Sequence, residues 1–377
     1  MYRDTWYFDG IAWKCSHREI PDSQHADLVM VFGDTDVFKN PLHYEELKSI
    51  FPDAHIVGAS SSGNILGSHV CHFPLIATAI KFDTSRVLVA TAEYHDGDDM
   101  EALTETLVSQ LPHEELRHLF LLSDGLTING SDLVRGINRA AKEVSVSGGM
   151  AGDGDRFQET YIIADSPARQ RCIAIIGFYG SDLRISSGCF AGWSEFGAER
   201  MITKSDGNVL YEIDGEPALD LYKKYLGTYA ADLPNSGLRF PLSIRPDKHE
   251  PEVIRTLLAI NESDKSITFA GDVPIGYFAR LMKPDMDALI GGAATAAKKI
   301  DRTDTLNGLG LVVSCVGRKI IMSQLVDEEL EAVQDILGEN VQLCGFYSYG
   351  EIAPFDNNIH KCELHNQTMT LTVIYEG

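Results

Sequence analysis

The sequence has few basic residues relative to its acidic ones. Thirty-two Lys and Arg stand against 55 Asp and Glu in 377 residues, which gives a formal net charge of −23. Binding to phosphates is dominated by Lys and Arg contacts, so this balance repels nucleic acid and anionic membrane surfaces. We therefore expect neither as a partner and interpret the acidity as a source of solubility.

Cysteines are few and irregularly spaced, and long hydrophobic runs are missing. The seven Cys include no CxxC pair, and an odd number cannot close into a full disulfide set. A reducing compartment fits this pattern best. The first residues lack a charged segment followed by an apolar one, and no run approaches 18 apolar residues. We expect a soluble cytoplasmic protein without a signal peptide or a transmembrane helix.

Short catalytic signatures are also missing. The sequence contains no GxSxG elbow, no GxxxxGK[ST] phosphate loop, no HExxH pair, and no GxGxxG after a strand. Many active sites have no short signature, so this argues only modestly against an enzyme. The hydrophobic fraction of 44% and charged fraction of 23% are those of an ordinary globular protein.

An internal repeat organises the chain. Its first copy begins with the buried-strand pattern DLVMVFG at 27–33, continues with a short helix at 43–51, and reaches a second apolar run at 55–57. The copy ends in the loop GASSSGNI at 58–65. The same order of strand, helix, strand and Gly-rich loop returns twice. The second copy comprises 119–122, 131–142, 144–147 and 148–154, and the third comprises 311–314, 327–337, 341–344 and 345–352.

The loops of the first and third copies align directly, GASSSGNI with GFYSYGEI. Because the flanking order matches too, we interpret the copies as duplications. A hairpin is predicted at 201–212 around an Asp-Gly turn, and a helix follows Asp214-Gly-Glu-Pro217. We expect an α/β fold of two modules built from repeated strand–helix–strand–Gly-loop units, with mixed sheets flanked by helices. The predicted division is an N-terminal extension at 1–26, a first module at 27–214 with two copies, and a second module at 215–377 with one copy.

Two Gly-rich loops are candidate anion sites. The backbone amides around Ser60, Ser61 and Ser62, and those around Gly149 and Asp153, could face a ligand where a helix begins. Glycines that only allow sharp turns after buried strands explain each loop equally well. Recurrence favours a site, because parallel strands bind ligands beyond their carboxyl ends.

The third copy carries the most informative side chains. Cys315 and Arg318 follow one predicted strand, while Tyr347, Tyr349 and Glu351 follow its expected neighbour. Arg can hold a carboxylate in a two-point fork, tyrosines offer flat apolar faces with a hydroxyl each, and Glu can accept an ammonium. This set suits a zwitterion such as an amino acid. The alternative is that Arg318 and Glu351 pair with each other and the tyrosines pack in the core.

A possible metal cluster lies near the end of the chain. His360, Cys362 and His365 are ligand-type residues at short spacing. A metal needs three or four convergent ligands, and no second cluster completes the set. A surface His360 with packed Cys362 and His365 is the competing interpretation, and the metal site stays unassigned.

Taken in order, several stretches resemble the FIST family, whose N- and C-terminal modules occur in signalling proteins. They are IVGASSSG, SGGMAGD, TKSDGNVLYEIDGEPALDLY, SCVGR, GFYSYGEIAP and LHNQTMTLT, between about residues 56 and 372. Each motif is weak alone, whereas the ordered set is specific.

The resemblance implies a sensory module that binds small ligands such as amino acids and has no turnover. Some relatives resembling this architecture are nitric-oxide-sensing haemoproteins that regulate histidine kinases, so haem is an alternative cofactor, with no axial ligand assigned among the 12 histidines. The sequence shows no kinase, cyclase or F-box segment, so we expect signalling through a separate partner. An enzyme that uses Cys315 is the other alternative.

Overall fold

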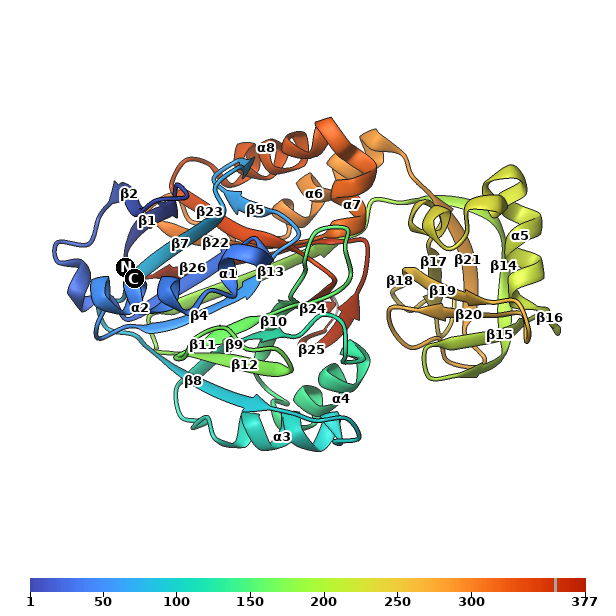
Figure 1. Cartoon of the computed structure of the whole chain (residues 1–377), viewed down its shortest axis with the longest axis horizontal. Coiled ribbons are helices and arrows are strands. Elements are labelled where there is room, and N and C mark those ends of the chain that lie inside the picture. Colours follow the sequence, from blue (N-terminus) through green and yellow to red (C-terminus); the bar gives the residue numbers. More distant parts are fainter. Residues whose placement is uncertain (356–357) are drawn as a thin grey trace.

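The computed structural model describes residues 1–355 and 358–377 and has two lobes (Figure 1). Residues 194–283 form the smaller lobe, and the remaining described residues form the core lobe. The two ends of the chain lie together in the core lobe, where the Met1 ammonium is 3.2 Å from the Glu376 carboxylate.

The core lobe contains three units with one topology. Each has two parallel strands and two antiparallel strands, in the spatial order second parallel, first parallel, antiparallel, antiparallel. The first unit consists of β4 (His55–Ser60), β3 (Leu28–Gly33), β7 (Leu75–Lys81) and β1 (Tyr2–Phe8), with α1 (Thr35–Phe38) and α2 (Pro41–Ile50). The second consists of β10 (Ser145–Met150), β9 (Leu116–Ser123), β12 (Cys172–Tyr179) and β8 (Arg86–Glu93), with α3 (Met100–Ser109) and α4 (Gly130–Ala140). The third consists of β23 (Val341–Ser348), β22 (Gly308–Cys315), β26 (Met369–Glu376) and β13 (Leu183–Phe190), with α6 (Met286–Lys298), α7 (Val316–Met322) and α8 (Val326–Leu337).

The predicted threefold repeat is confirmed by this arrangement. The first parallel strand of each unit is an apolar run, and Val31, Leu121 and Val313 on these strands are all buried. A buried strand needs apolar side chains on both faces, which explains why the sequence shows continuous runs rather than alternation. Asn side chains cap α2 and α4, since Asn40 and Asn129 each accept a hydrogen bond from an amide of the first turn.

The three units exchange strands in a ring. The hairpin β5 (Asn64–Leu66) and β6 (His69–Cys71) follows β4 but pairs with β23 of the third unit. The hairpin β24 (Gly350–Phe355) and β25 (Asn358–His365) follows β23 but pairs with β10 of the second unit. In turn, β11 (Ile162–Ala164) follows β10 and pairs with β4 of the first unit. Each sheet therefore depends on the next unit for an edge, while β2 (Trp13–Arg18) covers the other edge of the first sheet.

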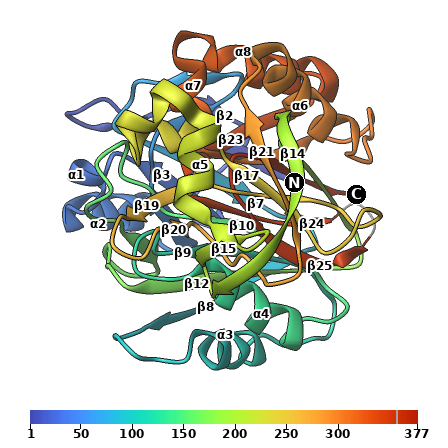
Figure 2. The same cartoon turned by 90° about the vertical axis from the view of Figure 1, so that its right-hand side faces the viewer.

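The small lobe is an antiparallel sheet covered by α5 (Ala218–Leu226) (Figure 2). Its strands are β14 (Ser194–Asp206), β15 (Val209–Ile213), β16 (Glu216–Pro217), β17 (Leu242–Arg245), β18 (Val253–Arg255), β19 (Leu257–Asn261), β20 (Ser266–Phe269) and β21 (Phe278–Lys283). The predicted hairpin is confirmed as β14 and β15, with Gly207 at positive φ in the turn. Short 3-10 helices are η1 (Ser23–His25), η2 (Gly227–Asp232), η3 (Asn235–Arg239) and η4 (Ser323–Leu325).

The predicted sequence division at residue 214 falls inside the small lobe, between β15 and α5. Strands on both sides of it share a sheet, because β13 pairs with β26 and β15 pairs with β20. The segment 1–26 contributes β1 to the first unit, where Trp6 and Phe8 are buried. The division at 214 therefore stays a prediction about the modules of the sequence. The two lobes of the structure are instead defined by which strands share a sheet.

Candidate functional site

The glycines that begin the three predicted loops lie inside β4, β10 and β23 at equivalent positions. The predicted loop starts are therefore wrong: the strands continue to Ser60, Met150 and Ser348, and β24 takes up the end of the third predicted loop. Gly58, Gly148 and Gly345 lie opposite a residue of the neighbouring parallel strand, and a Cβ on each would come within 1.8, 2.0 and 1.8 Å of that residue's carbonyl oxygen. Only glycine allows so close an approach of two backbones. The predicted alignment of Gly58 with Gly345 therefore matches the structure.

These loops meet through a ring of three backbone hydrogen bonds. The Ser62 amide donates to the Tyr347 carbonyl at 2.8 Å, and the Gly152 amide donates to the Ser60 carbonyl at 2.9 Å. The ring closes where the Tyr349 amide donates to the Met150 carbonyl at 3.1 Å. The expectation that the loops lie at strand ends is correct, and the exchange of strands brings all three to one place.

Arg318 is fully buried and holds α7 against α8. Its Nε and Nη2 atoms donate to the same carboxylate oxygen of Glu329 at 3.0 and 2.7 Å, and Tyr347 donates to the other oxygen at 2.7 Å. The side chains of Arg318, Tyr347 and Glu329 are all inaccessible to solvent. We therefore do not place Arg318 and Tyr347 in the candidate site.

Glu351 is also buried, and it does not pair with Arg318, so the alternative of an ion pair between these two residues is wrong. Its carboxylate accepts from the Ser348 hydroxyl at 2.7 Å and from the Thr368 amide and hydroxyl at 3.2 and 3.0 Å. Burial raises the pKa of Glu351 to about 8. Burial likewise raises the pKa of the Cys315 thiol, which opposes the thiolate that an enzyme would need.

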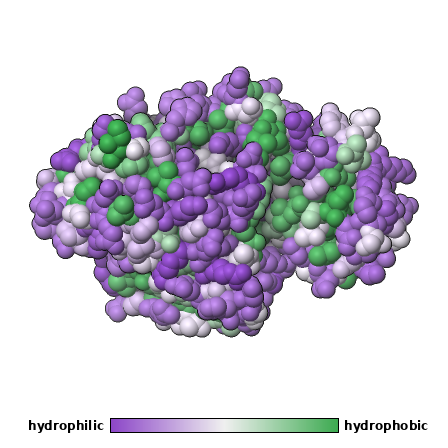
Figure 3. Space-filling view, viewed as in Figure 1, coloured by the Kyte–Doolittle hydropathy of each residue, from purple (hydrophilic) through white to green (hydrophobic). Residues whose placement is uncertain are grey.

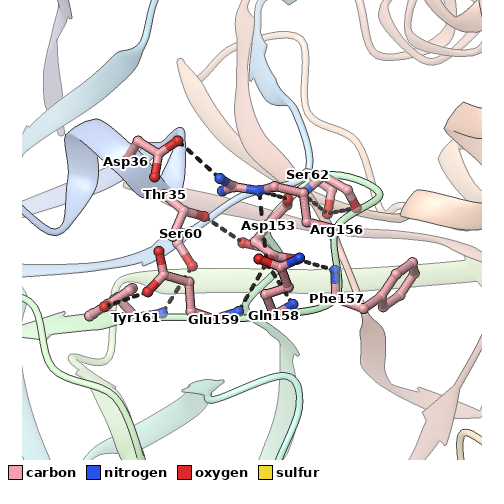
Figure 4. A network of polar contacts seen from close by, with 12 residues as sticks. Thr35, Asp36, Ser60, Ser62, Asp153, Arg156, Phe157, Gln158, Glu159 and Tyr161 are labelled. Atoms are coloured by element: carbon pink, nitrogen blue, oxygen red, sulfur yellow. Dashed lines mark hydrogen bonds and ion pairs between the residues drawn. The ribbon is translucent and has the colours of Figure 1, made fainter.

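Asp153 organises the loop that follows β10 (Figure 4). Its carboxylate accepts from the amides of Phe157, Gln158 and Glu159 at 2.9, 2.9 and 3.0 Å, and from the Tyr349 hydroxyl. Burial alone would raise the pKa of Asp153, but these hydrogen bonds outweigh it and lower the pKa. The carboxylate is thus held charged and ties the second loop to the third.

Gly149 has a packing role. A Cβ there would lie 2.5 Å from the Val313 side chain, so the glycine lets two sheets approach.

Two serine hydroxyls shape the first loop. The Ser60 hydroxyl accepts from the Tyr161 amide at 3.0 Å, and the Ser61 hydroxyl accepts from the Gly63 amide at 2.8 Å. These bonds fix the shape of the first loop.

A cavity of about 700 Å³ opens beside this ring of hydrogen-bonded loops, which we call the loop ring. Its walls come from all three units and include three predicted site residues, Ser61, Ser62 and Asp153. The other principal lining residues are Asp34, Thr35, Asp36, Gly63, Cys71, His72, Gly154, Arg156, Lys319, Gln324 and Asp327. This cavity is the candidate site, since parallel strands present ligands at their carboxyl ends.

Lys319 and Asp34 are two of the charged groups of the cavity that the sequence analysis missed. Lys319 is half-buried, its Nζ donates to the Ser62 carbonyl at 2.6 Å, and burial lowers its pKa. Asp34 directly follows β3 and is exposed to solvent; its carboxylate makes no hydrogen bond or ion pair within residues 1–355 and 358–377, and partial desolvation by the neighbouring walls raises its pKa. In the sequence, Asp34 comes directly after the predicted strand at 27–33, and this position could have identified it as a site residue.

The cavity does not fit a haem. A haem needs an axial ligand and a largely apolar slot. His72 lines the cavity, but Asp34, Asp36, Asp153 and Asp327 share its walls. Within the described part of the chain, no group of three His, Cys, Asp or Glu side chains is placed to hold a metal ion. His360 is exposed while Cys362 and His365 are buried, as the packing interpretation expects.

Comparison with known proteins identifies the family. The FIST N domain matches residues 27–216 and the FIST C domain matches residues 218–354. The uncharacterized protein MJ1623 of Methanocaldococcus jannaschii is 24% identical over 261 residues, or 62% of this chain. The match spans about half of that relative, 49% of its length.

Two solved structures show a weak likeness. A cyanuric acid hydrolase from A. caulinodans has a TM-score of 0.35 at 7% identity and covers 95% of this chain and 91% of its own. A second cyanuric acid hydrolase has a TM-score of 0.32 at 10% identity and covers 94% and 92%. Likeness at this level carries no conclusion about activity. Across residues 1–355 and 358–377, every helix is too short or too polar to cross a bilayer. With both domain matches in sequence order over most of its length, the chain belongs to the FIST family.

Proposed function

We propose that the cavity beside the loop ring binds a small amino-acid-like zwitterion and that the chain works as a sensor. FIST domains suggest a sensory, ligand-binding role in general terms. The observation that supports this ligand is the free Asp34 carboxylate in the same cavity as the Lys319 ammonium. Lys319 would donate to the ligand carboxylate, and Asp34 would accept from its ammonium group.

The electrostatics of the cavity favour a ligand that carries both charges. The Asp34 carboxylate lies close enough to Lys319 for each to act on the pKa of the other. Charge-assisted hydrogen bonds in a partly desolvated site are about twice as strong as neutral ones. At the rim, Arg156 donates to Asp36 at 2.9 Å, so this pair is already satisfied.

Three groups of the cavity could act as nucleophiles, namely Lys319, Ser62 and Cys71, and none of the three is activated. The Lys319 amine bonds to the backbone carbonyl of Ser62, whereas the Ser62 hydroxyl donates to the Gly154 carbonyl at 3.2 Å. The amine is therefore not paired with a hydroxyl that it could deprotonate. Burial raises the pKa of the Cys71 thiol on the cavity wall to about 11, which keeps it protonated. These features support binding without turnover.

Ligand binding would be reported through the loop that Asp153 holds. This loop lines the cavity on one side and contacts the Tyr349 hydroxyl on the other. We propose that a separate signalling protein, such as a histidine kinase, recognises the resulting surface. Haem remains an alternative cofactor at another position, which an absorption spectrum of the purified protein tests.

The decisive experiment is calorimetric titration of the protein with the 20 common amino acids. We expect saturable binding of at least one, weakened about 10- to 100-fold by Lys319→Met and by Asp34→Asn, as loss of a charge-assisted contact implies. Asp335→Asn is the matched control, because Asp335 is an exposed carboxylate on α8 that does not line the cavity, and it should bind as the native protein does. Failure of every amino acid to bind, or equal affinity in all variants, would refute the proposal.

A further inference from the structure

A second cavity, of about 510 Å³, lies between the core lobe and the small lobe. The core side is formed by the loop after β9, by Met150 and by two aromatic rings, and the small-lobe side by η3, β19 and β20. Its lining residues are Gly125, Leu126, Thr127, Ile128, Asn129, Met150, Phe157, Asn208, Pro234, Asn235, Leu238, Leu257, Leu258, Phe269, Ala270 and Tyr349. In a protein of net charge −23, this lining contains no charged side chain.

The core wall of this cavity presents two stacked aromatic rings. Phe157 and Tyr349 have ring centroids 4.5 Å apart and ring planes 12° apart. The Phe157 side chain is 42% exposed, although an exposed aromatic ring costs hydrophobic free energy. In Figure 4 its ring points away from the Asp153 carboxylate that holds the loop. The stack therefore offers an open aromatic face beside the cavity.

Backbone strain accompanies this exposed ring. Phe157 has φ +52°, a conformation that bulky residues rarely adopt. Its amide donates to Asp153 at 2.9 Å, so the loop holds the strained position. Strain that the surrounding structure maintains is typical of ligand-binding segments.

The small lobe supplies the facing apolar wall. Leu257 and Phe269 are buried in its core, while Leu258 is 47% exposed. Figure 3 shows apolar surface gathered in the cleft where the two lobes meet. Polar side chains of the lining are uncharged ones such as Asn235 and Asn208, whose side-chain amide nitrogen donates to the Phe269 carbonyl at 2.7 Å.

From these features we propose that the cavity between the lobes is a second ligand site, which takes an uncharged aromatic molecule. Its ring would lie between the Phe157–Tyr349 stack and the Leu257–Leu258 wall, with a polar substituent at the Asn235 amide. A charged ligand is disfavoured because no lining group would compensate its charge. This site is separate from the zwitterion site and does not depend on it.

The test is titration of the full chain with indole, an uncharged bicyclic probe. Binding is monitored by ligand-observed NMR. We expect one saturable site that is weakened at least about fivefold by Phe157→Gly and by Leu258→Asp. Glycine adopts positive φ readily, so Phe157→Gly removes the ring without destabilising the loop. The exposed position of Leu258 makes its replacement tolerable to the fold.

Ile275→Asp is the matched control, because Ile275 is 61% exposed on the same lobe and does not line the cavity. This variant should bind indole as the native protein does. Non-saturable binding, or equal affinity in all three variants, would overturn the proposal whatever the outcome for amino acids.

Discussion

Arg318 and Glu329 form a fully buried ion pair in which the guanidinium Nη2 lies 2.7 Å from the carboxylate Oε2. Arg318 also donates from Nη2 to the Leu289 carbonyl at 2.9 Å, so the pair links α7, α8 and α6. From the sequence, Arg318 is expected to bind the carboxylate of a ligand. In the fold, its partner is instead the carboxylate of Glu329.

Removing this arginine should destabilise the fold. We expect Arg318→Ala to lower the free energy of unfolding by about 3–5 kcal/mol, because Glu329 would remain buried without its partner. Urea denaturation measures the loss, and Lys319→Ala is the control, expected to change stability by less than about 1 kcal/mol. Unchanged stability of Arg318→Ala together with loss of amino-acid affinity would return Arg318 to the ligand site.

The affinity for a zwitterion should fall at both acidic and alkaline pH. Partial desolvation raises the pKa of Asp34, so its charge is lost above the usual range for an aspartate. Burial lowers the pKa of Lys319, so its charge is lost below the usual range for a lysine. Calorimetric titrations between about pH 4 and 10 should give a bell-shaped profile. Asp34→Asn should abolish the acidic limb and keep the alkaline one, whereas a flat profile for the native protein would contradict the proposed pair.

Glu351 should make stability decrease as pH rises. In the unfolded chain its carboxyl titrates at the ordinary pKa near 4.5, and in the folded chain at about 8. Between these values the folded state binds the extra proton, so folding stability is greatest below the unfolded pKa and is lost as pH rises through the window, by roughly 1.4 kcal/mol per pH unit. Thermal unfolding at several pH values should show a flatter dependence for Glu351→Gln, which mimics the protonated form. An identical slope in the two proteins would be evidence against the buried, protonated Glu351.

The glycines at which parallel strands touch should be intolerant of even one added methyl group. Gly58→Ala, Gly148→Ala and Gly345→Ala each place a Cβ against a backbone carbonyl, and we expect losses of roughly 2–4 kcal/mol in denaturation experiments. Gly291 on α6 is the control because a Cβ there meets nothing within 4 Å. Gly291→Ala should be neutral or stabilising by up to about 1 kcal/mol, through the higher helix propensity of alanine. Equal effects at all four positions would show that helix or strand propensity, rather than backbone contact, decides the cost.

The sequence alone was sufficient to predict the three repeated units. Continuous apolar runs around Val31, Leu121 and Val313 indicate strands buried on both faces, and such strands are specified locally by residue type. The loop alignment of Gly58 with Gly345 was also readable, because a position where backbones touch admits only glycine.

The exchange of strands among the units was decided by tertiary structure. A short strand such as β5 carries too few residues to specify its partner, and its pairing with β23 depends on where the third unit places that strand. The same exchange creates the cavity, since Ser62, Asp153 and Lys319 come from three different units.

The sequence likewise could not predict which side chain of α7 faces the cavity. Arg318 and Lys319 are adjacent, and successive residues of a helix point about 100° apart. The sequence determined that two cations follow β22. Only the packing of α7 on α8 decided that Arg318 meets Glu329 in the core while Lys319 faces the cavity, because the direction of a side chain depends on how its helix is rotated against its neighbours.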